Sequence, residues 1–163
     1  MSLVKQQNIS IENESKNEVS IELDQIMRLI PHRPPMLMIE RLTNVVADDR
    51  AIGIKTVSKE DWYFQGHFPK KAVMPGVMII EALAQTAATL AMHSLDLYDE
   101  EKLVYFMGID EARFRKMVVP GDTLHLEVAK LHRRGPVWRF KGLAKVNGEV
   151  VAEAIKTAMI ADK

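Results

Sequence analysis

The chain has 163 residues, which is enough for one packed domain and short for two. Its 22 basic and 22 acidic side chains cancel, so no global electrostatic field favours nucleic acid or a membrane surface. The absence of cysteine excludes disulfides, thiolate metal sites and a cysteine nucleophile, and the polar N-terminus has no signal-peptide pattern, so a soluble cytoplasmic domain is expected.

The first residues are rich in Lys, Gln, Asn, Ser and Glu and show no sustained hydrophobic period. This composition predicts a disordered N-terminal extension over residues 1–20, followed by a single domain over residues 21–163. The domain is expected to start with a short helix over Leu23–Leu29, which Pro31 stops. Two strands should follow, over residues 36–46 and 50–57.

Residues 77–92 are apolar on almost every side, which predicts a buried helix that is short for a membrane span. One charge interrupts this run, Glu81, with Gln85 one turn later on the same face. An isolated carboxylate on a buried helix is costly unless it has partners or a purpose. Glu81 is therefore paired with a buried Arg or Lys, placed at a subunit interface, or catalytic.

After this helix, an apolar pattern predicts a strand over residues 104–109, which a basic stretch over residues 112–116 follows. Alternating patterns predict three further strands, over residues 123–131, 138–146 and 149–160. Asn147-Gly148 between the last two strands is a strong hairpin signal, because a type I′ turn needs positive φ at both positions. Short turns make this part antiparallel. The sum, about six strands and one long buried helix, predicts an α+β domain in which a curved antiparallel sheet wraps a central helix.

The turn-rich segment before the helix contains His67. This residue is either a loop histidine bonded to the backbone or a general base, since imidazole exchanges protons near neutral pH. Gly76 stands at the start of the helix, where free N–H groups and the positive end of the helix dipole favour a developing oxyanion. A base, an acid and an oxyanion donor thus lie within one short stretch.

Three separated motifs resemble those of the β-hydroxyacyl-(acyl carrier protein) dehydratases of bacterial fatty-acid synthesis, of the FabZ type. The similarity covers roughly residues 23–160, and the spacer Lys70-Lys71-Ala72 departs from a more usual spacer containing Gly or Asn. The matching segments are Pro31-His32-Arg33, then His67-Phe68-Pro69, Met74-Pro75-Gly76 and Glu81-Ala82 with Gln85, and finally Phe114-Arg115-Lys116 with Val119-Pro120-Gly121-Asp122.

The resemblance implies the hotdog fold and dehydration of a (3R)-hydroxyacyl-(acyl carrier protein) to the trans-2-enoyl product, without a cofactor or a metal. By the same resemblance His67 is the general base that removes the α-proton, and Glu81 protonates the departing β-hydroxyl, directly or through a bound water. The Gly76 amide would polarise the thioester carbonyl. A related group that also isomerises the double bond typically has aspartate at the acid position, so Glu81 favours the plain dehydratase.

In this family the active site lies between two subunits, with the histidine from one chain and the carboxylate from the other, and dimers commonly assemble as trimers of dimers. The resemblance therefore implies a homo-oligomer, an unusual peptide geometry beside His67, and a cytoplasmic enzyme of fatty-acid and lipid A biosynthesis. The candidate residues of the acyl tunnel are Phe68, Met78, Tyr105 and Phe106; the methionine is alternatively core filler.

Between residues 113 and 145 there are nine Lys or Arg and two acids, a local balance of 9 − 2 = +7. This segment is either a solvated sheet face or a rim that steers an acidic acyl carrier protein with its phosphopantetheine-linked chain. Arg113, Arg115 and Lys116 are the expected carrier-binding residues, and no motif supports nucleic acid as a partner. Two other functions remain open: a hotdog thioesterase, and a non-catalytic acyl-binding module, against which the intact set of His67, Gly76 and Glu81 argues.

Overall fold

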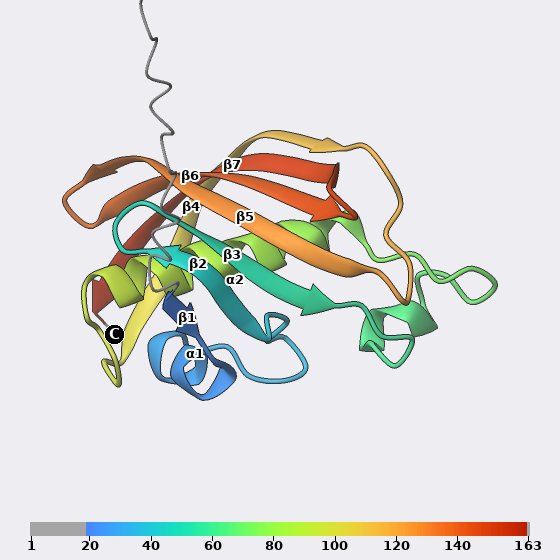
Figure 1. Ribbon diagram of the computed structural model, residues 1–163, viewed down its shortest axis with the longest axis horizontal. Helices are drawn as coiled ribbons and strands as arrows, with labels where there is room; N and C mark the ends of the chain where they lie inside the picture. Colours follow the sequence, from blue (N-terminus) through green and yellow to red (C-terminus); the bar gives the residue numbers. More distant parts are fainter. Residues whose placement is uncertain (1–18, 163) are drawn as a thin grey trace, which may run out of the picture.

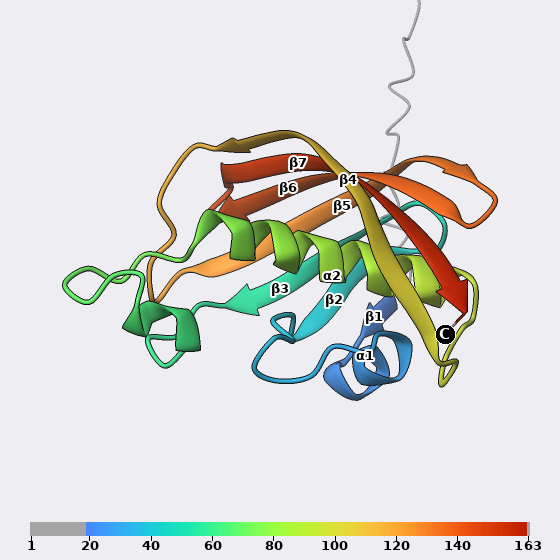
Figure 2. The same ribbon diagram turned by 180° about the vertical axis from the view of Figure 1, so that it is seen from behind.

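The computed structural model describes residues 19–162, which form one antiparallel sheet curved around the long helix α2 (Gly76–Ser94) (Figure 1). The view from behind shows α2 running across the concave face of the sheet, with the short helix α1 (Leu23–Leu29) beside β1 (Figure 2). This arrangement confirms the expected α+β hotdog fold. The strands follow the order β1-β2-β3-β5-β6-β7-β4 and comprise β1 (Val19–Ile21), β2 (Arg41–Val46), β3 (Arg50–Thr56), β4 (Lys102–Phe114), β5 (Thr123–Arg134), β6 (Val137–Val146) and β7 (Glu149–Asp162).

Helix α2 is the centre of the core, and 13 of its 19 residues are buried. It lies close to the sheet because small residues face it: a Cβ added to Gly53 of β3 would come within 2.2 Å of Thr86 Oγ1. The Thr86 hydroxyl donates to the Ala82 carbonyl at 2.9 Å, so this buried polar group is satisfied. By length and composition alone α2 also meets the criteria for a membrane span, but 72% of the relevant window is buried inside the protein, as in the core helix of a globular domain.

The hairpin predicted at Asn147-Gly148 joins β6 to β7, and both residues have positive φ, 49° and 79°. The alternation predicted for β5 is also confirmed, because Leu124, Leu126 and Val128 are buried whereas His125 is exposed. The strong local signals in the sequence therefore predicted the C-terminal strands correctly.

The N-terminal predictions were less accurate. The second strand was expected from residue 36, but β2 begins at Arg41, because the backbone of Met36 and Met38 bonds the side chain of Gln85 instead of a neighbouring strand. The extension expected over residues 1–20 lies mostly outside the described residues, and its last two, Val19 and Ser20, belong to β1.

The strand predicted over residues 104–109 is longer than expected and spans Lys102–Phe114. It pairs with β7 along its whole length, from Lys102 opposite Asp162 to Phe114 opposite Ala152. Much of the basic stretch predicted to follow this strand is therefore part of it. Together with β1, the sheet has seven strands instead of about six.

Candidate active site

The loop that carries His67 is held by backbone hydrogen bonds at both of its ends. It leaves the short 3₁₀ helix η1 (Trp62–Gln65), and the His67 N–H donates to the Tyr63 carbonyl at 3.0 Å. The Val73 N–H returns to the His67 carbonyl at 3.0 Å. The peptide bond between His67 and Phe68 is cis, in agreement with the unusual geometry expected there. These bonds fix the backbone from which the imidazole projects.

The ring of His67 is oriented by a hydrogen bond of 2.6 Å between its Nδ1 and the Val73 carbonyl. A carbonyl oxygen only accepts, so the Nδ1 must carry the hydrogen. In the neutral ring the other nitrogen, Nε2, then has a free lone pair. This is the tautomer that a general base working through Nε2 requires.

His67 and Gly76 line the same cavity, of about 430 Å³, together with apolar residues of α2 and the segment after β4. Gly76 is the first residue of α2, and its N–H has no hydrogen-bond acceptor within residues 19–162. A Cβ at this position would lie 2.6 Å from the ring of Phe114, so only glycine allows the ring to pack over the helix start. The structure thus brings the predicted base and the predicted oxyanion donor together.

Glu81 lies on α2 outside this cavity, and its side chain is 22% exposed. Gln85 donates its Nε2–H to Glu81 Oε1 at 3.0 Å, and the same amide is held by the Met36 carbonyl and the Met38 N–H. The Nε2 of His32 lies 3.4 Å from Glu81 Oε1. The sequence placed Gln85 beside Glu81 correctly, whereas the matching segment Pro31-His32-Arg33 was not connected with Glu81.

The neighbours of Glu81 lower the pKa of its carboxyl group below the ordinary value. The hydrogen bond to His32 is the largest cause, the bond from Gln85 and the charge of Lys156 act in the same direction, and burial opposes them. Lys156 itself is buried under α2, where its Nζ donates to the Ile80 carbonyl. Within residues 19–162 no ion pair joins Glu81 to an Arg or Lys: His32 is the basic side chain beside it, and Lys156 acts on it through its charge.

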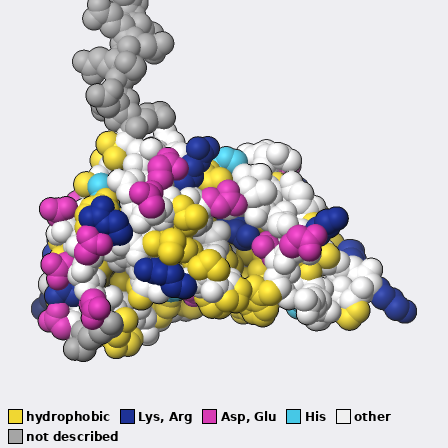
Figure 3. All heavy atoms as spheres, turned by 90° about the horizontal axis from the view of Figure 1, so that it is seen from below, with side chains coloured by type: hydrophobic (Ala, Val, Ile, Leu, Met, Phe, Trp, Pro, Cys, Tyr) yellow, Lys and Arg dark blue, Asp and Glu magenta, His cyan; other side chains and the backbone are white. Residues whose placement is uncertain are grey.

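Between residues 19 and 162, no hydrogen bond or ion pair joins His67 to Glu81. In one chain the predicted acid does not line the cavity of the predicted base. Around His67 lie apolar side chains that are exposed to solvent, notably Val77, 71% exposed, with Phe68, Phe114 and Met117. Figure 3 shows hydrophobic side chains gathered along one face of the molecule, with charges of both signs scattered around them.

The four candidate tunnel residues are not gathered around one cavity. Phe68 stacks on the His67 ring with centroids 3.9 Å apart, and Met78 is half-buried on α2. Phe106 lines a narrow apolar slot between β4 and the alanines of α2. Tyr105 is exposed and does not line that slot, since neighbouring residues on a strand point to opposite faces.

The basic segment is more neutral in the fold than its sequence indicates. Arg115 pairs with Glu153 at 3.2 Å and Lys116 pairs with Glu149, both acids of β7. Among residues 19–162, five of the nine basic residues between 113 and 145 form ion pairs, and one of their partners, Glu127, lies in the same span. Arg115 and Lys116 nevertheless line the cavity of His67, whereas Arg113 does not.

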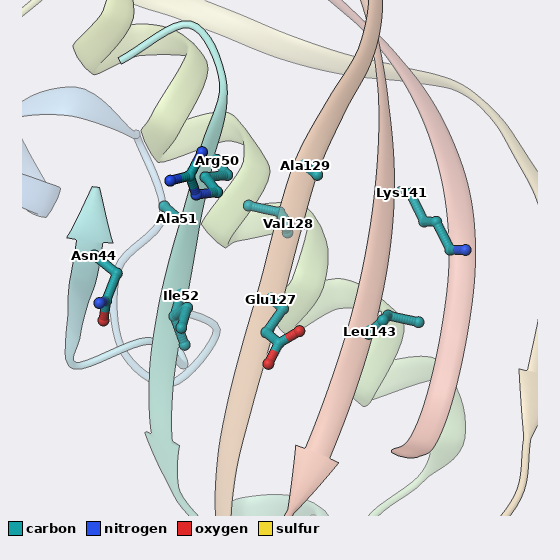
Figure 4. A pocket seen from close by; sticks show the side chains of 9 residues that line it. All are labelled: Asn44, Arg50, Ala51, Ile52, Glu127, Val128, Ala129, Lys141 and Leu143. Carbon is teal, nitrogen blue, oxygen red and sulfur yellow. The ribbon is translucent and has the colours of Figure 1, made fainter. Parts of the chain in front are cut away.

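A second cavity, of about 380 Å³, lies on the face of the sheet that points away from α2 (Figure 4). Ile52, Glu127 and Leu143 project into it from three neighbouring strands, with α2 behind them. None of the predicted site residues lines it. In the described part of the chain, no group of three or more His, Asp or Glu residues is arranged to hold a metal ion.

Sequence comparisons relate the chain to one enzyme family. A model of the FabA-like domain matches residues 30–155. The chain is 51% identical to the 3-hydroxyacyl-(acyl-carrier-protein) dehydratase FabZ of Rhodospirillum rubrum over 150 residues, covering 92% of this chain and 94% of that protein. It is 53% identical over 141 residues to the protein of the same name from Gluconacetobacter diazotrophicus, covering 86% and 88%.

Solved structures support the same fold at low sequence identity. The dehydratase heterocomplex ApeI:P from Xenorhabdus doucetiae superposes with a TM-score of 0.73 at 21% identity, covering 85% of this chain and 92% of that one. Cj0977, a virulence protein from Campylobacter jejuni, gives a TM-score of 0.61 at 15% identity, with 82% of each chain covered. At these identities the likeness shows the fold alone.

Proposed function

The chain belongs to the FabZ-type dehydratases of the FabA-like family, and on that basis we propose that it converts (3R)-hydroxyacyl-(acyl carrier protein) to the trans-2-enoyl thioester and water. The observation that carries this proposal is the cavity shared by His67 and Gly76. There a base with a defined tautomer lies near a free N–H at a helix N-terminus. Proton abstraction next to a thioester carbonyl needs both groups.

In the proposed reaction the Nε2 of His67 takes a proton from the α-carbon of the thioester. The thioester oxygen gains negative charge as this C–H bond breaks, and the Gly76 N–H stabilises that charge. The electron pair then forms the double bond while the bond from the β-carbon to its hydroxyl oxygen breaks. The proton that His67 has taken passes to the Glu81 carboxylate, which delivers it, directly or through a bound water, to this oxygen so that it leaves as water. His67 is then again a neutral base and Glu81 again a carboxylate, which completes the cycle.

The surroundings of Glu81 fit a proton donor that must be regenerated in each cycle. His32, Gln85 and Lys156 lower the pKa of the carboxyl group, so its resting form is the carboxylate at neutral pH. Once protonated during the reaction, such a group is a stronger acid than an ordinary glutamate. The hydrogen bonds through Gln85 also hold the carboxylate in one orientation.

The separation of His67 and Glu81 within one chain favours an active site that is completed by a second copy of the chain. The edge strand β4 and the surroundings of His67 expose apolar side chains, among them Phe114 and Met107, which a second chain would cover. A dimer would then contain two sites, each with His67 from one chain and Glu81 from the other. Three such dimers would form the expected hexamer.

The acyl chain would be delivered by an acyl carrier protein in the cytoplasm, as part of fatty-acid and lipid A biosynthesis. Arg115 and Lys116 line the cavity of His67, so an acidic carrier bound there would bring its phosphopantetheine arm to the base. Their ion pairs with Glu153 and Glu149 weaken this attraction and leave Arg113 as the less neutralised member of the set.

The purified protein should be tested with (3R)-hydroxyacyl-(acyl carrier protein), and both the formation of the conjugated enoyl thioester and the release of free thiol should be followed. Enoyl formation without thiol release supports the dehydratase. Thiol release would identify a hotdog thioesterase, and tight binding without either product would identify an acyl-binding module. The same assay with acyl chains of different lengths would define the preferred substrate.

A further inference from the structure

Lys156 is a buried basic residue that the proposed reaction does not use directly. It lies on β7, on the face of the sheet that packs against α2, and only 3% of its surface is exposed. Its Nζ donates to the carbonyl of Ile80 in α2. The flanking strands place Ile109 and Phe140 opposite it, so its strand neighbours are apolar.

The hydrogen bond of this amine places it next to the peptide bond between Ile80 and Glu81. The Ile80 carbonyl is the acyl half of the peptide bond to Glu81, so Lys156 fixes the backbone from which the carboxylate projects. His32 approaches the same carboxylate from the segment after α1, and Gln85 from the next turn of α2. Within residues 19–162, His32 and Lys156 are the titratable groups that act on Glu81, and Glu81 is the one that acts on Lys156.

A buried ammonium without a hydrogen-bonded carboxylate is costly. Burial accordingly lowers the pKa of Lys156 to about 7, from an ordinary value of 10.5, and the charge of Glu81 opposes this shift. The charge of Lys156 in turn lowers the pKa of Glu81. By linkage, each group must change the proton affinity of the other by the same factor.

We propose that Lys156 is a positioning residue for proton transfer at Glu81: it holds the Ile80–Glu81 peptide from beneath the helix and couples its own charge to that of the carboxylate. This inference rests on the proposed role of Glu81. A lysine that only filled space would have no effect on the protonation of Glu81.

Two substitutions separate the charge of Lys156 from its hydrogen bond. Lys156→Met removes both, whereas Lys156→Gln keeps a donor for the Ile80 carbonyl without the charge. Lys55→Met is the matched control, because Lys55 is also buried on the sheet but pairs with Asp61 at 2.9 Å. All three variants should first be shown to keep the secondary structure and assembly state of the unmodified protein.

The direct measurement is a titration of the Glu81 carboxyl carbon by NMR in the full-length protein. We expect the pKa of Glu81 to rise in both Lys156 variants and to stay unchanged in Lys55→Met. In the reciprocal experiment, Glu81→Gln should lower the pKa of the Lys156 amine by the amount by which Lys156→Gln raises that of Glu81. An unchanged Glu81 titration in both Lys156 variants would overturn the inference.

The kinetic measurement separates this inference from the proposed function. The acidic limb of the profile of kcat against pH should move to higher pH in Lys156→Gln and Lys156→Met, while KM is nearly unchanged. If the pKa of Glu81 shifts but the acidic limb of the kcat profile does not, Glu81 is not the proton donor. The proposed effect of Lys156 on proton transfer would then also be rejected. A shift in Lys156→Met alone would assign the effect to the hydrogen bond and reject the coupling of charges.

Discussion

The two proposed catalytic side chains are prepared for their roles in different ways. His67 is oriented by one hydrogen bond, from its Nδ1–H to the Val73 carbonyl, and that bond selects the tautomer. Glu81 is held by Gln85 and lies beside His32 and Lys156, all of which favour its carboxylate form. The histidine is therefore oriented by one hydrogen bond, and the carboxylate form of the glutamate is favoured by hydrogen bonds first and by nearby charge second.

His67→Ala and Glu81→Gln should each lower kcat by at least about 100-fold, because each removes a group that transfers a proton. Steady-state dehydration of a hydroxyacyl-(acyl carrier protein) measures this loss. His125→Ala and Glu127→Gln, on the outward side of β5, are the matched controls and should retain activity. Activity close to normal in His67→Ala would contradict the assignment of the base.

Lys156→Met should stabilise the protein at neutral and lower pH. The pKa of Lys156 is about 7 in the fold and 10.5 ordinarily, so between these values the unfolded chain binds more protons and wild-type stability rises with pH. Below pH 7 the folded protein bears the full cost of the buried ammonium, a few kcal/mol at about 1.4 kcal/mol per pKa unit.

The free energy of unfolding of this variant should therefore exceed that of the unmodified protein most clearly below pH 7, and the difference should shrink toward pH 10. Urea denaturation at a series of pH values, at one protein concentration, measures it. A difference that is constant across this range would show that the ammonium is not desolvated in the folded protein.

At the scale of the elements, the site depends on how α2 begins. The helix starts at Gly76, directly after the loop of His67, and Met74 N–H donates to the Val118 carbonyl at 2.8 Å. This bond ties the helix start to the segment that follows β4. The ring of Phe114 then covers Gly76, so the loop, the helix start and the end of β4 form one wall of the cavity.

Gly76→Ala should lower kcat/KM by about 10- to 100-fold while the protein stays folded, because a displacement of about 1 Å at a reacting centre has effects of this size. The added Cβ would lie 2.6 Å from the Phe114 ring, which is 54% exposed and free to move into the cavity. Gly66→Ala is the control, since a Cβ there meets nothing within 4 Å. The double variant Gly76→Ala with Phe114→Ala should recover part of the lost activity; no recovery would place the defect at the amide itself.

At the scale of the whole molecule, one chain has Glu81 outside the cavity of His67 and exposes apolar side chains to solvent. In the described part of the chain, the edge strand β4 pairs on one side, with β7, and exposes Tyr105, Phe106, Met107 and Ile109. Exposed apolar edges of this kind invite pairing with another chain. A second chain could bury this strand, and the proposed shared site requires that it also bring its Glu81 to His67.

If the site is shared, mixing the inactive variants His67→Ala and Glu81→Gln should restore part of the activity. Some mixed dimers would then contain one site with both His67 and Glu81 intact. Recovery should be measured under conditions in which subunit exchange is shown independently, for example by fluorescence transfer between labelled chains. Complete exchange without any recovery would place the site within one chain.

The interaction with the carrier should depend on salt. At high ionic strength the range of surface charge falls to roughly 3 Å, so KM for the carrier-bound substrate should rise, and a short thioester without the carrier should show a much weaker effect. Arg115→Glu with Lys116→Glu should raise KM for the carrier-bound substrate and leave kcat on the short thioester nearly unchanged.

The matched control for this charge reversal is Lys141→Glu with Lys145→Glu on β6. Neither residue lines the cavity of His67. Equal salt sensitivity for both substrates would mean that Arg115 and Lys116 act only as a solvated face, in keeping with their ion pairs to β7.

The sequence by itself determined the elements whose signals are local. The buried helix predicted over residues 77–92 is α2, the turn at Asn147-Gly148 is a hairpin, and the alternation in β5 gave the correct inward face. Periodicity and turn chemistry are properties of neighbouring residues, so they can be recognised without knowledge of the fold. The motifs around His67 and Gly76 are local in the same sense, and the structure places these two residues in one cavity.

Only the tertiary structure decided which distant residues meet. His32 lies beside Glu81 from 49 positions away, Lys156 reaches the Ile80 carbonyl across 76, and acids of β7 neutralise Arg115 and Lys116. These contacts depend on the register in which β7 pairs with β4 and on the position of α2 against the concave face of the sheet. A shift of one residue would turn Lys156 to the opposite face, and no local pattern specifies that register. The electrostatic environment of Glu81 is therefore a property of the folded sheet and helix, although the identity of Glu81 as the one charged residue in the buried run was visible in the sequence.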